Sequence, residues 1–138
     1  MEQWEINAVI KQCDGAFETP VAQREIYATL LEKLHQNGNC IFAYNGKALG
    51  YCAFYANDLE QKNAYISLIA VAPEYQKLHI GTKLLSDSFE MMRACGMNCC
   101  LLEVRKNNLN AIRFYEMNNF VMIEEREESY LMKCELKF

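Results

Sequence analysis

Two short, almost continuously apolar runs separated by one amphipathic segment constrain the fold of this chain more than any other feature. The runs are AYISLIAVA (residues 64–72) and CCLLEV (residues 99–104). Apolar runs of this length are typical of strands that are covered on both faces of a parallel sheet. Between them, residues 80–94 carry apolar side chains at helical spacing, and Gly96 follows where such a helix would end. The pattern therefore predicts a right-handed strand–helix–strand crossover.

The residues before this unit predict two helices and a hairpin. A short helix is expected over residues 5–12, and one long helix over residues 19–37, with Thr19 as its N-cap and Pro20 in its first turn. Apolar runs flank the Asn-Gly pair at residues 45–46. An antiparallel hairpin is expected there, because Asn-Gly readily adopts the left-handed turn that joins two twisted strands.

The residues after the unit predict a short helix and two antiparallel strands. The helix is expected over residues 108–118, and the strands over residues 120–125 and 129–136. The buried side of the helix at residues 80–94 is expected to consist of Leu84, Leu85, Phe89, Met92 and Cys95. Together the segments predict a single domain over residues 1–138 with an α/β fold, in which a central mixed sheet carries helices on both faces.

Composition and charge narrow the class of protein. Of the 138 residues, 51% are hydrophobic, which is enough for one sizeable core. The net charge of −4 argues against a nucleic-acid partner, because nucleic acids usually bind basic domains. No run reaches the roughly 18 apolar residues of a membrane span, and the N-terminus lacks the pattern of a secretory signal. We expect a cytoplasmic protein without a membrane partner, either a monomer or a homodimer.

The seven cysteines are expected to be free thiols rather than disulfides or metal ligands. They are odd in number, and several lie within apolar runs, as buried thiols in a reducing compartment do. No C-x-x-C pair occurs, and the two histidines, His35 and His79, are far apart in the sequence. The sequence therefore gives no support for a metal site.

The segment PEYQKLHIGTKLL, residues 73–85, joins the first apolar run to the helix and raises the question of a phosphate site. A helix that begins after a strand presents unpaired N–H groups and a partial positive charge. Lys77, Thr82 and Lys83 add positive charge or a hydroxyl, and Gly81 permits a close backbone approach. Neither GxxxxGK(S/T) nor GxGxxG is present. The residues alone leave two alternatives: an anion-binding loop or a plain strand–helix corner.

This segment resembles the signature Gln/Arg-x-x-Gly-x-Gly/Ala of the GNAT superfamily of N-acetyltransferases. Gln76 and Gly81 match its two ends, whereas His79 stands where the first glycine is expected. A second element, LLEVRKNNLNAIRFYEMNNF (residues 101–120), is similar to a later segment of the same superfamily. In this order and at this separation, the two elements look most like those of the bacterial ribosomal-protein alanine N-acetyltransferases.

The resemblance implies a GNAT fold that binds acetyl-CoA, without a metal, where two parallel strands separate. The implied cofactor-binding residues are Ile69, Ala70, Val71, Gln76, Lys77, Leu78, His79, Ile80, Gly81, Thr82 and Asn108. Ile69–Val71 would pair with the pantetheine arm, and Lys77–Thr82 would surround the diphosphate. From its own chemistry, Asn108 is also a candidate N-cap of the helix that follows. The His79 side chain would point to solvent, donate to a phosphate, or narrow the site.

The resemblance also implies two catalytic groups, with Glu103 as general base and Tyr115 as the acid that protonates the leaving thiolate. The reaction needs both kinds of group, because an amine is protonated at neutral pH and the departing thiolate requires a proton. Each residue also has a purely structural interpretation. Glu103 could pair with Arg105 or Lys106, and Tyr115 could simply pack into the core.

The implied function is that of an acetyl-CoA-dependent N-acetyltransferase, an acyltransferase whose partner is an amine acceptor, either a protein or peptide N-terminus or a small molecule. An alternative of another class is a non-catalytic CoA-binding sensor or interaction module. His79 favours that alternative, and the presence of Glu103 and Tyr115 argues against it. A third hypothesis is a nucleotide-binding regulatory domain, which would bind ATP and not CoA.

Overall fold

The computed structural model describes residues 3–14, 21–24, 27–44, 48–76 and 79–136. Its helices are α1 (Gln3–Cys13), the short 3₁₀ helix η2 (Val21–Gln23), α2 (Tyr27–Asn37), the short 3₁₀ helix η3 (Pro73–Tyr75), α3 (Ile80–Ala94) and α4 (Leu109–Met117). Its strands are β1 (Asn39–Tyr44), β2 (Ala48–Tyr55), β3 (Asn63–Val71), β4 (Cys99–Arg105), β5 (Val121–Glu125) and β6 (Ser129–Glu135). The helix predicted between the two apolar runs is α3, and its bounds are those predicted.

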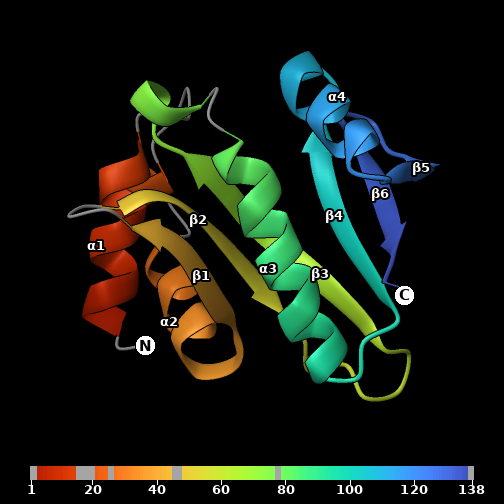
Figure 1. Cartoon of the computed structure of the whole chain (residues 1–138), viewed down its shortest axis with the longest axis horizontal. Coiled ribbons are helices and arrows are strands. Elements are labelled where there is room, and N and C mark those ends of the chain that lie inside the picture. The colour runs from red at the N-terminus through yellow and green to blue at the C-terminus, as the bar shows by residue number, and fades with distance from the viewer. Residues whose placement is uncertain (1–2, 15–20, 25–26, 45–47, 77–78, 137–138) are drawn as a thin grey trace.

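The six strands form one mixed sheet in the order β1-β2-β3-β4-β6-β5. β3 and β4 are parallel, and the other neighbouring pairs are antiparallel. α1 and α2 pack on one face of the sheet, whereas α3 and α4 pack on the other, and α4 follows β4 at the end where α3 begins (Figure 1). The β3–α3–β4 unit is the predicted crossover, and the predicted mixed α/β fold is confirmed.

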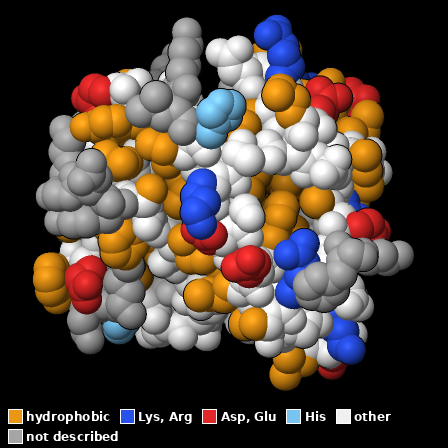
Figure 2. Space-filling view, in the orientation of Figure 1, with side chains coloured by type: hydrophobic (Ala, Val, Ile, Leu, Met, Phe, Trp, Pro, Cys, Tyr) orange, Lys and Arg blue, Asp and Glu red, His pale blue; other side chains and the backbone are white. Residues whose placement is uncertain are grey.

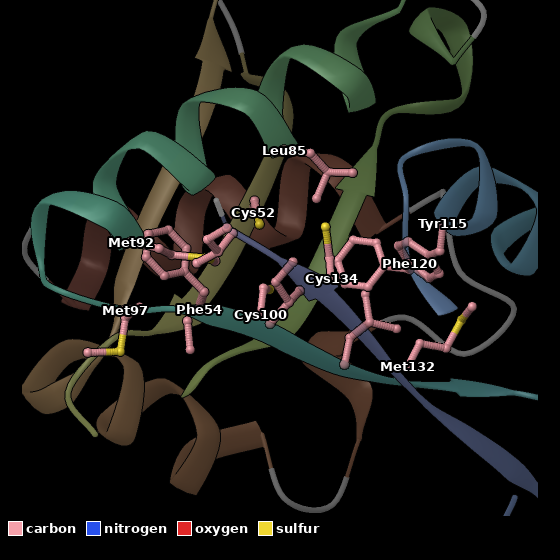
Figure 3. Packing of buried hydrophobic residues seen from close by; sticks show 14 of the residues in the cluster. Cys52, Phe54, Leu85, Met92, Met97, Cys100, Tyr115, Phe120, Met132 and Cys134 are labelled. Atoms are coloured by element: carbon pink, nitrogen blue, oxygen red, sulfur yellow. The ribbon is translucent and has the colours of Figure 1, made fainter. Parts of the chain in front are cut away.

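Two hydrophobic clusters fix the helices on the sheet. On the side of α1 and α2, Ile10 and Leu34 pack with Tyr51 and Leu68. The larger cluster, on the side of α3 and α4, includes Cys52, Phe54, Leu85, Met92, Cys100, Tyr115, Phe120 and Met132 (Figure 3). Complete burial of one large apolar side chain stabilises a fold by roughly 1.5–3 kcal/mol. Buried contacts from Leu85 to Met92 therefore hold α3 along much of its length, and with it the position of its N-terminus.

A β-bulge at Ser67 divides β3 into two halves. Ala53 of β2 pairs with Leu68, but the next residue, Phe54, pairs with Ile66, so Ser67 is an extra residue in β3. Side chains alternate between the faces of a regular strand, and one extra residue reverses that alternation. Accordingly, Ile66 belongs to the cluster under α3, whereas Leu68 belongs to the cluster under α1. A bulge also bends and twists the strand that carries it.

The long helix predicted over residues 19–37 is wrong in its first half. In the described part of that half, residues 21–24, the structure has the short η2, and α2 occupies the second half. Thr19 and Pro20, the predicted cap and first-turn residue, lie outside the described residues. The buried Asp14, at the end of α1, accepts a hydrogen bond from the backbone N–H of Ala22 at 3.1 Å. That N–H falls in the first turn of the predicted helix, where no helical carbonyl could bond it, so the carboxylate of Asp14 takes the place of the predicted Thr19 cap.

One of the five positions predicted to be buried on α3 is also wrong. Cys95 is exposed, because it is the C-cap of the helix and Gly96 follows it at φ +86°. The turn carries Cys95 away from the sheet. Ser88 is buried in the middle of the helix, a position that apolar patterning could not identify.

All seven cysteines are free thiols, as the sequence predicts. Five of them are buried: Cys13, Cys52, Cys99, Cys100 and Cys134. Burial raises the pKa of the Cys52 thiol to about 12, so this thiol stays protonated at neutral pH and is a poor nucleophile. Among the described residues, no helix has the length and apolar character needed to cross a membrane.

Candidate active site

The parallel strands β3 and β4 separate at the end of the sheet where α3 begins. Their pairing covers four residue pairs and ends at Ile66 and Leu102. β3 nevertheless continues to Val71, and β4 to Arg105, and the two strands diverge toward the top of Figure 1. The bulge at Ser67 coincides with the point of separation. Beyond it, no strand of the described residues pairs with the edge of β3 that faces β4, so backbone groups on that edge are available to a ligand.

A cavity of about 420 Å³ lies where the strands separate, between β3, the N-terminus of α3 and α4. It is lined by Ile69, Ala70, Val71, Gln76, His79, Gly81, Thr82, Asn110, Ala111, Phe114, Tyr115, Met117 and Asn118. The space-filling view shows hydrophobic side chains in the hollow between α3 and α4 (Figure 2). Small-molecule sites have volumes of roughly 300–1,000 Å³ and are mostly apolar with a few polar groups, so the cavity has the size and character of such a site.

The N-terminus of α3 lacks a side-chain cap. Its N-cap residue, His79, makes no capping hydrogen bond and has a left-handed backbone, with φ 60° and ψ 19°. The N–H groups of Ile80, Gly81 and Thr82 have no helical carbonyl to bond, as is true of the first turn of any helix. In α4, by contrast, the side chain of Asn108 caps the helix by accepting from the N–H of Ala111 at 3.2 Å. The uncapped turn beside the cavity is therefore suited to bind an anion.

The backbone of His79 explains why a glycine is typical at this position. A left-handed conformation costs an L-residue about 1–2 kcal/mol, and glycine avoids this cost. We expect His79→Gly to raise the free energy of unfolding by about 1 kcal/mol, because the strain outweighs the extra entropy of glycine in the unfolded chain. We also expect the affinity for CoA, the ligand that the resemblance implies, to stay the same or increase. Urea denaturation and isothermal titration calorimetry measure the two quantities.

Lys62 offers a matched control for His79→Gly. It is exposed, lies outside the cavity lining and has the same backbone conformation, with φ 59°. Lys62→Gly should give a similar gain in stability and leave CoA binding unchanged. A marked loss of CoA affinity in His79→Gly alone would contradict the prediction and identify the imidazole as a ligand.

Gly81 lies against the ring of Phe114, which belongs to α4. A Cβ atom at position 81 would come within 3.0 Å of Phe114 Cζ and 3.2 Å of its Cε1. These distances are shorter than ordinary van der Waals contacts, so a side chain at Gly81 requires a shift of the ring. The close approach places the start of α3 and the middle of α4 on the two sides of one narrow site.

Tyr115 combines a place in the core with a place in the cavity wall. Its ring packs against the rings of Phe114 and Phe120, with both centroid distances 5.6 Å. Burial raises the pKa of the phenol well above its ordinary value, and the neighbouring thiols of Cys52 and Cys100 add to the shift. The phenol is therefore protonated throughout the pH range in which enzymes are assayed. Both interpretations of Tyr115, a core aromatic and a proton donor, are compatible with this position.

Glu103 lies on the other side of the sheet. Leu102 and Val104 point into the cluster under α3 and α4, so Glu103 between them points to the opposite face. Its partners are neither Arg105 nor Lys106: Arg126 Nη1 donates to Glu103 Oε2 at 2.7 Å. This hydrogen bond, and a second from a serine hydroxyl, lower the pKa of the Glu103 carboxyl below its ordinary value. Glu103 is therefore ionised at neutral pH.

The structure brings most of the predicted cofactor residues to the cavity. Those that line it are Ile69, Ala70, Val71, Gln76, His79, Gly81 and Thr82, together with Tyr115. Ile80, Asn108 and Glu103 lie outside the lining, and Lys77 and Leu78 lie outside the described residues. Gln76 is partly committed elsewhere, because its Nε2 donates to the carbonyl of Val71 at 3.1 Å. That bond ties the turn before α3 to the end of β3.

Apart from Tyr115, the residues on the α4 side of the cavity were missed by sequence reasoning. The missed residues are Asn110, Ala111, Phe114, Met117 and Asn118. These positions recur every three or four residues and so form one side of the helix. That spacing was visible in the sequence, but it could not show whether this side faces the core or a ligand.

Comparison with known proteins gives a family match. Residues 6–120 of the chain match the acetyltransferase (GNAT) family. No curated protein matches the chain significantly.

Solved structures with the same fold include two that cover the whole chain. The ribosomal-protein-S18-alanine N-acetyltransferase from Escherichia coli is 21% identical with a TM-score of 0.81, over 100% of this chain and 92% of that one. Ard1 from Thermoplasma volcanium is also 21% identical with a TM-score of 0.81, over 100% of this chain and 95% of its own. The PaiA N-acetyltransferase from Thermoplasma acidophilum, in complex with coenzyme A, is 16% identical with a TM-score of 0.76, over 98% and 95% of the two chains. At these identities the likeness establishes the fold.

Proposed function

This chain belongs to the acetyltransferase (GNAT) family, and on that premise we propose that it transfers the acetyl group of acetyl-CoA to a primary amine, either a protein N-terminus or a small molecule. Acetyl transfer from acetyl-CoA is the activity of the family. The observation that supports an acetyl-CoA site in this chain is the separation of β3 from β4 after four residue pairs, over a cavity that ends at the uncapped N-terminus of α3.

The residues that would hold acetyl-CoA form a path from the gap in the sheet to α3. The free edge of β3 at Ile69–Val71 would bond the amide groups of the pantetheine arm, as a neighbouring strand would. The N–H groups of Ile80, Gly81 and Thr82 would bind the diphosphate. When bound, acetyl-CoA supplies an acetyl thioester as the electrophile. A backbone N–H of β3 at the gap would polarise its carbonyl group.

Glu103 would act on the acceptor from the opposite face of the sheet. A primary amine is protonated at neutral pH and must lose a proton before it can attack. Glu103 is ionised there and can accept this proton, either directly or through a water molecule. Its depressed pKa makes it a weak base that is always available. The carboxylate also attracts the cationic form of the amine to the gap.

Tyr115 would protonate the leaving sulfur from the cavity side. Its buried phenol holds its proton at neutral pH. The high pKa would disfavour transfer to a thiolate in water, but a thiolate formed in the same buried place is destabilised by the same loss of hydration. Glu103 and Tyr115 would thus accept and supply protons on opposite sides of the gap.

Thermal stability with added ligand tests the binding part of the proposal. Acetyl-CoA and CoA, each at a hundred times its dissociation constant, should add roughly 2.7 kcal/mol to the free energy of unfolding. ATP at the same concentration should have much less effect, because it lacks the pantetheine arm that would occupy the edge of β3. Stabilisation by ATP without stabilisation by CoA would contradict the proposal.

Release of free thiol tests the reaction. Acetyl-CoA is mixed with the enzyme and with one amine: a peptide with an N-terminal alanine (the alanine-terminated peptide), spermidine, an amino sugar or an aminoglycoside. The free CoA thiol is then measured with a thiol reagent. At least one amine should give release that depends on the enzyme. Binding of CoA without release from any of these amines would argue against the proposed acceptor class.

A further inference from the structure

Two neighbours in the β5–β6 hairpin hold the carboxylate of Glu103. Arg126 Nη1 donates to Glu103 Oε2 at 2.7 Å, and Ser129 Oγ donates to the same oxygen at 2.8 Å. The guanidinium of Arg126 is in turn held by Glu124, whose Oε2 accepts a hydrogen bond from Arg126 Nε. A planar guanidinium bound by two carboxylates is restricted in both position and rotation.

The two bonds to Glu103 leave its second carboxylate oxygen available. Both fall on Oε2, and no described residue donates a hydrogen bond to Oε1. A carboxylate that is fixed through one oxygen presents the other in a defined direction. The side chains of Glu103 and Arg126 remain partly accessible, at 38% and 45%, so an acceptor can approach them.

We propose that Arg126 is a positioning residue for acetyl transfer, which fixes Glu103 through Oε2 so that Oε1 receives the proton of the acceptor amine. The inference rests on the proposed role of Glu103 as the base. It adds a residue from the β5–β6 hairpin to a site that otherwise consists of β3, β4, α3 and α4. Precise placement of a reacting group lowers the barrier because less motion remains to be restricted in the transition state.

The surroundings of Glu103 support this role. The groups next to it are Arg126 of the hairpin, Ser129 of β6 and Tyr65 of β3. Arg105 lies two residues further along the same face of β4 and pairs with Glu128, and Glu124 contacts Arg126. The hydrogen bonds from Arg126 and then Ser129 lower the pKa of Glu103. Burial, and secondarily the charge of Glu103, raise the pKa of the Tyr65 phenol. At neutral pH the arrangement therefore contains an ionised carboxylate and an un-ionised phenol.

A competing role for Arg126 predicts the opposite result. Its guanidinium could occupy the place of the ammonium group of the acceptor, so that binding requires its displacement. Removal of Arg126 would then increase kcat/KM for cationic amines. If Arg126 positions Glu103, its removal decreases kcat.

The first experiment compares Arg126→Met and Arg126→Lys with wild-type enzyme, using acetyl-CoA and the alanine-terminated peptide, or spermidine if the peptide is not acetylated. Arg126→Met should lower kcat about fivefold, the order of one exposed charged contact. It should also move the acid limb of the kcat/KM profile to higher pH, because Glu103 then gains a proton at a higher pH. Arg126→Lys keeps the positive charge, so its fall in kcat and its shift of the acid limb should both be smaller. Glu128 lies in the same hairpin but is not bonded to Glu103. Glu128→Gln should therefore change neither kcat nor the pH of the acid limb.

A double-mutant cycle separates this inference from the proposed function. If Arg126 acts through Glu103, Arg126→Met should have little further effect in a Glu103→Gln background. An equal loss in both backgrounds, or an unchanged or raised kcat/KM in Arg126→Met alone, would overturn the inference while Glu103 keeps its role. Full activity of Glu103→Gln would show that Glu103 is not the general base, and it would overturn this inference as well.

Discussion

Replacing Gly81 by Glu should lower the affinity for CoA by about a hundredfold while the chain remains folded. The new carboxylate would lie at the first turn of α3, where it would compete with the diphosphate for the same N–H groups and repel its charge. Loss of one or two charge-assisted hydrogen bonds costs roughly 3 kcal/mol, which corresponds to about a hundredfold in affinity. The fold should survive, because a negative charge at a helix N-terminus is favourable by about 0.3–1 kcal/mol.

Two further substitutions at Gly81 separate charge from bulk. Gly81→Gln has nearly the same size as the glutamate variant but no charge, and Gly81→Ala adds only the Cβ that would meet the Phe114 ring at 3.0 Å. Both should weaken CoA binding much less than Gly81→Glu. Isothermal titration calorimetry gives the affinities, and circular dichroism confirms that each variant is folded. Equal affinities for the glutamate and glutamine variants would show that the diphosphate binds elsewhere.

Replacing Tyr115 by Phe should lower kcat by about a hundredfold or more, which is the usual contribution of a general acid. The substitution removes only the hydroxyl. The ring and its contacts with Phe114 and Phe120 are kept, so stability and CoA affinity should change little. A large fall in kcat without a matching change in the dissociation constant of CoA would assign the phenol to the chemical step.

Steady-state kinetics and calorimetry on the same preparation of Tyr115→Phe test this prediction. Phe114→Leu is a suitable comparison, because it alters the cavity wall without removing a proton donor. Phe114→Leu should weaken CoA binding more than Tyr115→Phe does. An unaltered kcat in Tyr115→Phe would leave this residue with its structural role in the core.

Strong local signals made much of the fold predictable from the sequence. Proline at position 73 and glycine at position 96 bracket the helix that became α3, and continuous apolar runs identified β3 and β4. The Asn-Gly pair at residues 45–46 lies outside the described residues, but the antiparallel pairing of β1 with β2 agrees with the predicted hairpin. Such features work because each depends on a few residues and their own backbone preferences.

Features that depend on long-range register could not be predicted. Arg126 meets Glu103 only because β4 and β6 pair antiparallel and bring the hairpin beside β4, 23 residues away in sequence. The bulge at Ser67 is likewise a property of the pairing of β3 with β2, and nothing in the composition of β3 marks it. The hydrogen bond from the N–H of Ala22 to Asp14, a buried carboxylate eight residues away, likewise depends on the packing of α1 and has no mark in the local pattern.

The placement of the cavity and of Glu103 on opposite faces of the sheet has a consequence for the size of the acceptor and the order of release. An acceptor that arrives on the side of Glu103 does not pass through the 420 Å³ hollow, so that volume sets no upper limit on its bulk. Under the proposed function, the terminus of a folded protein would therefore fit as well as a polyamine. Under the proposed function, spent CoA would also leave from the side of α3 and α4 while the acetylated product is still bound on the side of Glu103.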